Sequence, residues 1–112
     1  MNKLFQMISS FFSTGAYDLD GYHFKNELKK SGTGILLDVR TGSEYATGKL
    51  PSAVHIDYLG SSFATELAKL NKGKRYFVYC RSGNRSSSAV LEMRKLGFEA
   101  FSLAGGISAW PK

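Results

Sequence analysis

The 112-residue sequence contains one cysteine, Cys80, two histidines and two prolines. A single cysteine excludes an internal disulfide framework and a multi-cysteine zinc site. His23 and His55 are far apart in the sequence, which argues against a histidine-based metal site, so we expect neither a metal nor another cofactor. No stretch approaches the roughly 20 apolar residues that cross a bilayer, so no transmembrane segment is expected. With 43% hydrophobic residues and little proline, the chain is not disordered, and its length predicts one compact domain.

Positive charge is concentrated in one part of the sequence. The chain has a formal net charge of +6, and residues 72–95 contain seven lysines and arginines against Glu92 alone. This segment surrounds Cys80, and a positive field there suits a small anion or an acidic partner. The alternative is a solvated basic face with no role. Nucleic acid is not an expected partner, because the basic residues are not interleaved with exposed aromatic residues.

The first 16 residues precede the strand and helix pattern of the rest of the chain. Apolar residues recur there at helical spacing and predict an amphipathic segment: Leu4, Phe5, Met7, Ile8, Phe11 and Phe12. It has three interpretations, namely a helix packed on the domain or a partner, a segment that is loose or lies on a membrane surface, and a cleaved signal peptide. The apolar stretch is short and interrupted by polar residues, so we favour the packed or loose helix. We therefore expect a cytoplasmic protein, whereas a signal peptide would make it an exported one.

Strand and helix signals alternate from residue 17 onward. Short apolar runs predict strands at residues 17–19, 35–39, 53–57, 76–79 and 99–103. Helical spacing predicts helices at residues 20–30, 63–70 and 86–96, with Asp20 as the N-cap of the first, and helical turns at residues 42–47 and 107–110. Strands separated by helices indicate βαβ units. The sequence therefore predicts an α/β fold, with a central parallel five-stranded sheet and helices on both faces.

Two polar groups follow strands of this predicted sheet, at the edge where parallel sheets bind ligands. One is Asp38 and Arg40, and the other is Cys80 with the loop that follows it, Arg81, Ser82, Gly83, Asn84 and Arg85, up to a helix at Ser86. Successive backbone N–H groups in such a loop form an anion-binding nest, and the helix N-terminus adds positive potential. We expect them to lower the pKa of the cysteine from about 8.5 into the range of ~3.5–7.5. The competing interpretation is an inert, buried cysteine.

The Asp38 group is expected to be structural. Asp38 follows an apolar run, so it should be partly buried and paired, and we favour loop orientation with Arg40 over substrate contact. His23 and His55 are expected to be ordinary helix and strand residues.

Three segments resemble the single-domain rhodaneses, which are thiosulfate sulfurtransferases. They are DVRTGSEYATGKLPSAVHI, VYCRSGNRSSSAV and LAGGISAW. The resemblance covers about residues 17–112, which we expect to form a rhodanese domain, and leaves residues 1–16 outside. It implies the five-stranded parallel sheet and a persulfide on Cys80 between two half-reactions. Lys49, Leu50 and Ser52 depart from the family pattern, but they lie in a connecting segment and cast no doubt on catalysis.

The length of the loop bears on the reaction class. Cys80 to Arg85 is a C-x4-R loop of six residues, one fewer than in the cell-cycle phosphatases that share the rhodanese fold. A tighter loop fits the terminal sulfur of a persulfide better than a phosphate, and no aspartate is evident as a general acid. The alternatives to a sulfurtransferase are a sulfur-carrier or interaction module with low turnover and a small phosphatase-like enzyme.

The predicted mechanism is ping-pong sulfur transfer. The Cys80 thiolate attacks thiosulfate or another sulfane donor, while Arg81, Arg85 and the loop N–H groups hold the anion. Cyanide, a small thiol or a protein thiol then takes the sulfur. Ser86 is expected to cap the helix and hydrogen-bond the loop. An alternative role for Arg85 is to brace the loop or to pair with an acidic neighbour.

Overall fold

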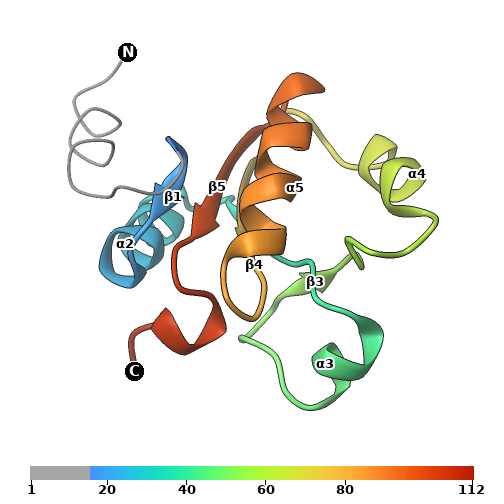
Figure 1. Ribbon diagram of the computed structural model, residues 1–112. Coiled ribbons are helices and arrows are strands. Elements are labelled where there is room, and N and C mark those ends of the chain that lie inside the picture. The colour runs from blue at the N-terminus through green and yellow to red at the C-terminus, as the bar shows by residue number, and fades with distance from the viewer. Residues whose placement is uncertain (1–15) are drawn as a thin grey trace.

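The computed structural model describes residues 16–112, which contain a five-stranded parallel sheet with the strand order β1-β5-β4-β2-β3 (Figure 1). The strands are β1 (Asp18–Leu19), β2 (Ile35–Asp38), β3 (Val54–His55), β4 (Arg75–Tyr79) and β5 (Glu99–Leu103). The helices are α2 (Gly21–Ser31), α3 (Gly42–Ala46), α4 (Phe63–Ala68), α5 (Asn84–Lys95) and the 3₁₀ helix η1 (Ile107–Ala109). The predicted α/β fold and its parallel five-stranded sheet are confirmed.

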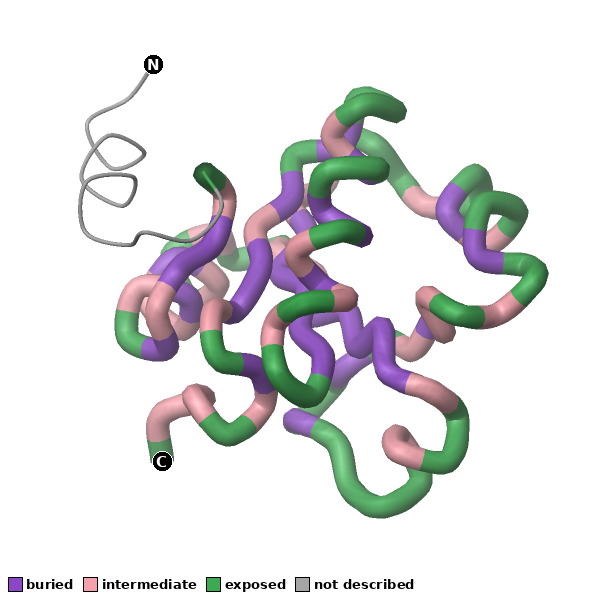
Figure 2. Tube along the Cα trace, in the orientation of Figure 1, coloured by how far each residue is buried: buried purple, intermediate pink, exposed green. Residues whose placement is uncertain are grey.

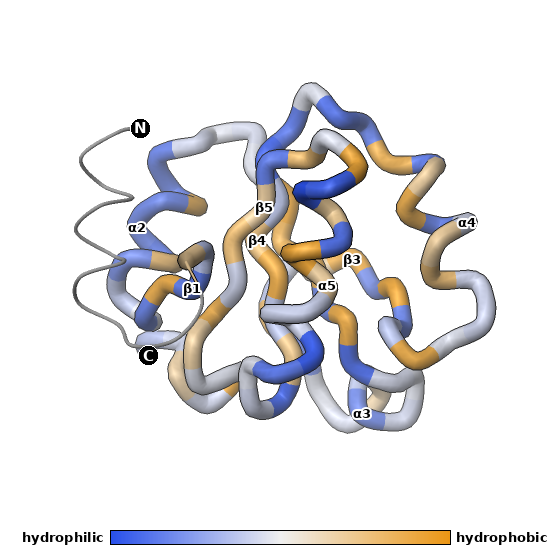
Figure 3. The backbone as a smooth tube through the Cα atoms, turned by 45° about the horizontal axis from the view of Figure 1, so that its top comes forward, coloured by the Kyte–Doolittle hydropathy of each residue, from blue (hydrophilic) through white to orange (hydrophobic). Residues whose placement is uncertain are grey.

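Helices cover both faces of the sheet, as predicted. Tyr76, Val78 and Cys80 point to one face, where they pack against residues of α4 and α5. Phe77 and Tyr79 point to the other face, where they pack against residues of α2 and η1. β4 is therefore buried on both faces, which explains its unbroken run of apolar residues. Figure 2 shows the buried positions running through the central strands, and Figure 3 shows hydrophobic residues along β4 with hydrophilic ones on α2.

Most predicted elements agree with the structure to within two residues at each end, and two of the differences have a clear cause. The strand predicted at residues 53–57 is only Val54–His55, because β3 lies at the sheet edge and pairs only with β2. The helix predicted from Ser86 begins at Asn84, since Gly83 adopts a left-handed φ of 103° and turns the chain into the helix earlier. The N-cap prediction for α2 is confirmed, with the Asp20 carboxylate accepting the His23 N–H at 2.8 Å.

The predicted amphipathic segment of residues 1–16 lies, apart from Ala16, outside the described residues. None of the helices among residues 16–112 combines the length and the hydropathy that a membrane span requires.

Candidate active site

The thiol of Cys80 lies directly after β4, at the carboxyl edge of the sheet, and the residue is fully buried. Three groups surround its sulfur. The Gly83 N–H donates to Sγ at 3.0 Å and the Ser86 N–H donates at 3.4 Å. The Ser86 hydroxyl lies 3.5 Å from the same sulfur. The loop therefore folds around the sulfur and points its donors at it.

Two opposing effects set the pKa of Cys80. Burial raises it, because a buried thiolate loses its hydration. Hydrogen bonds from the Ser86 side chain and from the backbone N–H groups of Ser86, Gly83 and Ser82 stabilise the thiolate and lower the pKa. The donors prevail, so the pKa of Cys80 lies below its ordinary value, the direction that the sequence predicted.

The turn after β5 supports this loop. The Ile107 N–H donates to the carbonyl oxygen of Cys80 at 2.9 Å. Gly106 lies so close to the loop that a Cβ there would overlap the Arg81 carbonyl. The second glycine of the LAGGISAW segment therefore meets a steric need, because at Gly106 only a hydrogen leaves room for the loop backbone.

Arg85 forms a two-point ion pair with Glu44, which the sequence analysis did not select. Nη1 lies 2.7 Å from Oε1 and Nη2 lies 3.0 Å from Oε2, and the two side chains are 23% and 24% exposed. The Arg85 guanidinium, helped by the Thr41 N–H and hydroxyl, lowers the pKa of Glu44 to about 2. Glu44 is also the third residue of α3 in a capping box with Thr41. The T-x-x-E pattern could have placed Glu44 at a helix start, but not beside Arg85.

The other loop residues differ in exposure. Arg81, Ser82 and Asn84 are exposed, while Gly83 is half-buried and Ser86 is buried. Among residues 16–112 Arg81 forms no ion pair. The loop thus places Gly83 and Ser86 at the sulfur, while Arg81 is open to solvent and Arg85 is held by a carboxylate.

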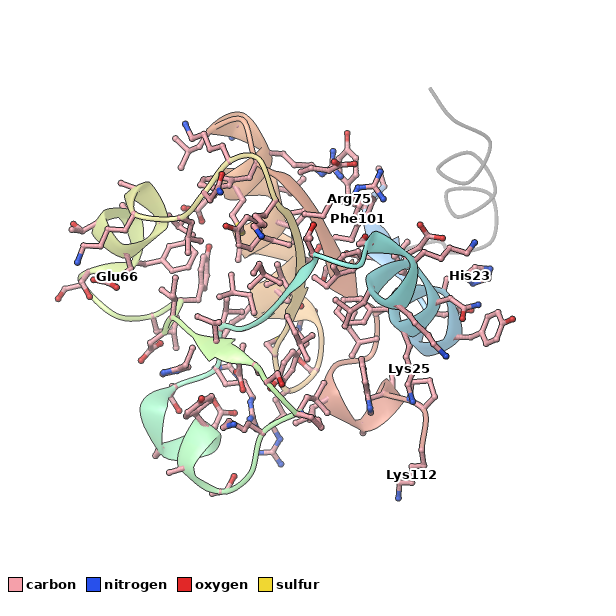
Figure 4. The ribbon with its side chains drawn as sticks, turned by 180° about the vertical axis from the view of Figure 1, so that it is seen from behind. His23, Lys25, Glu66, Arg75, Phe101 and Lys112 are labelled. Atoms are coloured by element: carbon pink, nitrogen blue, oxygen red, sulfur yellow. The ribbon has the colours of Figure 1, made fainter. Side chains whose placement is uncertain are left out.

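The structure corrects the predicted position of the positive charge. Five of the seven basic residues of the segment 72–95 lie at the start of β4 or at the end of α5, at the edge of the sheet opposite Cys80: Lys72, Lys74, Arg75, Arg94 and Lys95. Figure 4 labels Arg75 at that end of β4. A strand followed by an antiparallel helix returns the chain to its starting edge. These five basic residues are therefore close to Cys80 in sequence but distant from it in space.

Asp38 and Arg40 form a buried cluster with Tyr79. Arg40 Nη2 lies 2.7 Å from Asp38 Oδ2, and the Tyr79 hydroxyl donates to the same oxygen at 2.7 Å. Arg40 also donates to the Gly48 carbonyl at 2.7 Å, and the Leu50 N–H donates to the Tyr79 hydroxyl at 3.1 Å. These bonds tie the connection between α3 and β3 to the sheet. The geometry supports the structural role that we favoured.

The two histidines lie apart from the sulfur. His23 contacts Asp20 at 2.9 Å on α2, where Figure 4 labels it, and His55 Nε2 lies 2.7 Å from the Arg40 carbonyl oxygen. Within residues 16–112 no three His, Cys, Asp or Glu side chains are grouped to hold a metal ion.

Comparison with known proteins finds a matching family and similar sequences. Residues 22–112 match the rhodanese-like domain family. YtwF of Bacillus subtilis, provisionally named a sulfurtransferase, is 37% identical over 75 residues, which are 67% of this chain and 71% of that protein. A sulfurtransferase of Allochromatium vinosum is 28% identical over 85% of this chain and 88% of that protein.

A solved structure shares the fold. A rhodanese-like domain protein of Staphylococcus aureus has a TM-score of 0.73 and 30% identity, covering 85% of this chain and 91% of that one. Some relatives are much longer, and the chain spans 20% of the length of two of them.

Proposed function

This chain belongs to the family of rhodanese-like domains, and we propose that it is a thiosulfate sulfurtransferase. Its relatives include a protein named a sulfurtransferase. One observation carries the proposal: the loop points two backbone N–H groups and a hydroxyl at the sulfur of its only cysteine. A buried sulfur with such donors suits a negative charge that stays on sulfur throughout the reaction.

The first half-reaction loads the cysteine. The Cys80 thiolate attacks the outer sulfur of thiosulfate, and a new S–S bond forms between Cys80 and that sulfur. The bond from the outer sulfur to the sulfonate sulfur breaks, and its electron pair leaves with sulfite. Sulfite leaves as a stable anion and needs no general acid.

The second half-reaction restores the thiolate. The carbon of cyanide, or the sulfur of a thiolate, attacks the terminal sulfur of the persulfide, and the S–S bond breaks. Thiocyanate or a new persulfide leaves, and the electron pair returns to Cys80 as the thiolate. A cytoplasmic location, which we propose for this protein, would supply reduced small thiols and protein thiols as acceptors.

The loop residues have different roles in binding the donor anion. We assign attraction of the donor anion to exposed Arg81, and contact with its oxygens to the backbone of residues 82–86. Arg85 has five N–H donors, of which the Glu44 contacts occupy two. Glu44 therefore fixes the plane of the Arg85 guanidinium and leaves donors that can reach an anion. In this assignment Asp38 and Arg40 brace the loops and do not contact the donor.

The test follows sulfur on the protein. Incubation with thiosulfate should add the mass of one sulfur atom, and cyanide should remove it with release of thiocyanate. Because Cys80 is the only cysteine, Cys80→Ser should neither gain the sulfur nor turn over. Continued turnover by Cys80→Ser would refute the mechanism. Loading without turnover would favour a carrier, and faster hydrolysis of an aryl phosphate would favour a phosphatase.

A further inference from the structure

Two buried hydroxyl groups lie in line behind the sulfur of Cys80. Ser86 Oγ on α5 lies 3.5 Å from Cys80 Sγ and 2.7 Å from Ser102 Oγ on β5. Ser86 and Ser102 are both fully buried. Ser102 is paired with Val78 of β4, two residues before Cys80, so strand pairing brings it beside the site. Figure 1 shows α5, which contains Ser86, packed across β4 and β5, and Ser102 belongs to β5.

Counting protons assigns the direction of the bond between the two serines. The Ser86 hydroxyl has one proton and two acceptors besides Ser102, the Gly83 carbonyl at 3.2 Å and the Cys80 sulfur. Within the described residues the Ser102 hydroxyl has Ser86 as its partner. If Ser86 donated to Ser102, the proton of Ser102 would be buried without an acceptor, which is costly. Ser102 therefore donates to Ser86.

Ionisation of Cys80 changes the direction of the Ser86 hydroxyl proton and leaves the hydrogen bond from Ser102 to Ser86 in place. With a neutral thiol, the Cys80 S–H donates to Ser86 and the Ser86 proton is directed to the Gly83 carbonyl. With a thiolate, the Ser86 proton turns to the sulfur, and the Gly83 carbonyl keeps the Ser87 N–H at 3.0 Å. In both states the lone pair of Ser86 that faces Ser102 is occupied. The Ser86 proton is therefore free to point only toward the loop.

We propose that Ser102 is a positioning residue: by donating to Ser86 it holds and polarises the Ser86 hydroxyl, and so strengthens the hydrogen bond that this hydroxyl donates to the Cys80 thiolate. Ser102 does not touch the donor and acts through Ser86. The importance of Ser102 for turnover rests on the proposed sulfur transfer. The effect of Ser102 on the Cys80 thiolate does not depend on that proposal. Nothing in the sequence marks Ser102, because its role arises only from its pairing across β5, β4 and α5.

Other groups near the sulfur stay unchanged when Ser102 is altered. Arg85 is the charged side chain of α5 whose charge interacts with that of Cys80, and Glu44 and Asp57 in turn interact with Arg85. Asp38, the last residue of β2, and Arg40, which follows that strand, are bonded to each other. A change at Ser102 removes no charge. Any shift in the ionisation of Cys80 is thus traced to the hydroxyl.

The experiment measures alkylation of Cys80 by iodoacetamide across pH, in the full chain. Since Cys80 is the only cysteine, the rate reports on its thiolate alone. Ser102→Ala should raise the midpoint by about 0.1 to 0.7 units, because it removes a polarisation of roughly 10–30% of a charge-assisted hydrogen bond of about 1.5–3 kcal/mol. The rate limit at high pH should not change. Ser88→Ala, at an exposed position of α5, is the matched control and should leave the midpoint in place.

A double-mutant cycle distinguishes an effect of Ser102 that passes through Ser86 from a general loosening of the core. Ser86→Ala should raise the midpoint at least as much as Ser102→Ala, and the double variant should match Ser86→Ala. Ser102→Thr keeps the hydroxyl and should restore the midpoint, and thermal melting verifies that each variant is folded. An unchanged midpoint in Ser102→Ala, or a shift that adds to that of Ser86→Ala, would overturn the proposal.

The outcome is independent of the proposed function. If thiosulfate fails to load sulfur on Cys80 while Ser102→Ala still shifts the midpoint, sulfur transfer from thiosulfate is wrong and the role of Ser102 stands. If sulfur loads normally and the midpoint does not move, the reverse holds.

Discussion

Arg85 places a positive charge at the end of the catalytic loop, and Glu44 holds it in a fixed plane through two contacts of 2.7 and 3.0 Å. An arginine held in this way can still donate to a thiosulfate oxygen through its remaining N–H groups. We propose that Arg85 contributes both to binding of the donor and to the shape of the loop. The two contributions can be separated, because only binding depends on the charge of the donor.

We predict that Arg85→Ala lowers kcat/KM for thiosulfate by about 10- to 150-fold, from the roughly 1.5–3 kcal/mol of a charge-assisted hydrogen bond. Arg85→Lys should recover part of the loss, because it restores the charge without the planar fork. An uncharged sulfur donor should lose less. Steady-state kinetics with both donors measure this. Equal losses for both, with a lowered melting temperature, would leave Arg85 a purely structural role.

Glu44 gives the same ion pair a dependence on pH. Its pKa falls from 4.5 to about 2, chiefly because of the hydrogen bond from Arg85, so the folded state binds a proton more weakly than the unfolded chain. The stability from this contact is therefore complete above pH 4.5 and is lost as pH falls through about 2. Melting curves should show Glu44→Gln less stable than the native protein at neutral pH and similar to it near pH 2. A gap that stays constant with pH would contradict this.

At the scale of elements, the turn between β5 and η1 determines where the catalytic loop can lie. Gly105 and Gly106 both have positive φ, 83° and 77°. They differ in their surroundings. A Cβ at Gly106 would overlap the Arg81 carbonyl, whereas a Cβ at Gly105 would meet only the Ala109 Cβ, at 3.3 Å. The two positions therefore share a positive φ but differ in their access to the loop.

We predict that Gly106→Ala displaces the loop and lowers kcat/KM for thiosulfate by about 10- to 100-fold, the order of loss that a misplacement of 1 Å causes. Gly105→Ala is the matched control, because φ is positive there too, and its activity should fall much less. Kinetics and thermal melting of both variants provide the comparison. Equal losses of activity would mean that backbone strain, and not contact with Arg81, is responsible.

At the scale of the whole molecule, the positive charge is split between two edges of the sheet. Arg81 and Arg85 lie at the carboxyl edge with Cys80, while Arg75 and Arg94 lie at the opposite edge. Glu44 offsets Arg85, so exposed Arg81 carries most of the uncompensated charge beside the sulfur. Attraction of a small anion then depends on local charge more than on the net charge of +6.

Residues 1–16 lie outside the part of the chain, residues 22–112, that matches the family. We predict that their removal leaves thiosulfate turnover nearly unchanged, since Gly83 and Ser86, which donate to the Cys80 sulfur, lie in the later part of the chain. Removal should alter solubility or association, because six large apolar side chains are lost. Kinetics and size-exclusion chromatography measure the two effects, and a large loss of turnover would show that the segment serves the active site. A mature protein that begins at Tyr17 would instead identify a signal peptide.

The sequence by itself determined the order and type of the elements, and with them most of the fold. Apolar runs and helical spacing are local properties, and parallel strands joined by helices form few topologies. The loop from Cys80 to Ser86 was also predictable, because a contiguous segment folds around its own cysteine. The length of β3 was not, since the sequence does not say that Val54–His55 lies at a sheet edge.

Only the tertiary structure decided which distant groups meet at the site. Glu44 and Arg85 are 41 positions apart, and Ser86 and Ser102 are 16 apart. Their contacts depend on how α3 and α5 pack and on the register between β4 and β5, and no local pattern encodes these. The return of α5 to the edge where β4 starts likewise carried Arg94 away from Cys80. The loop around Cys80 is made of contiguous residues, so the sequence predicts it. Contacts between distant residues and the distribution of charge depend on the path of the chain through space.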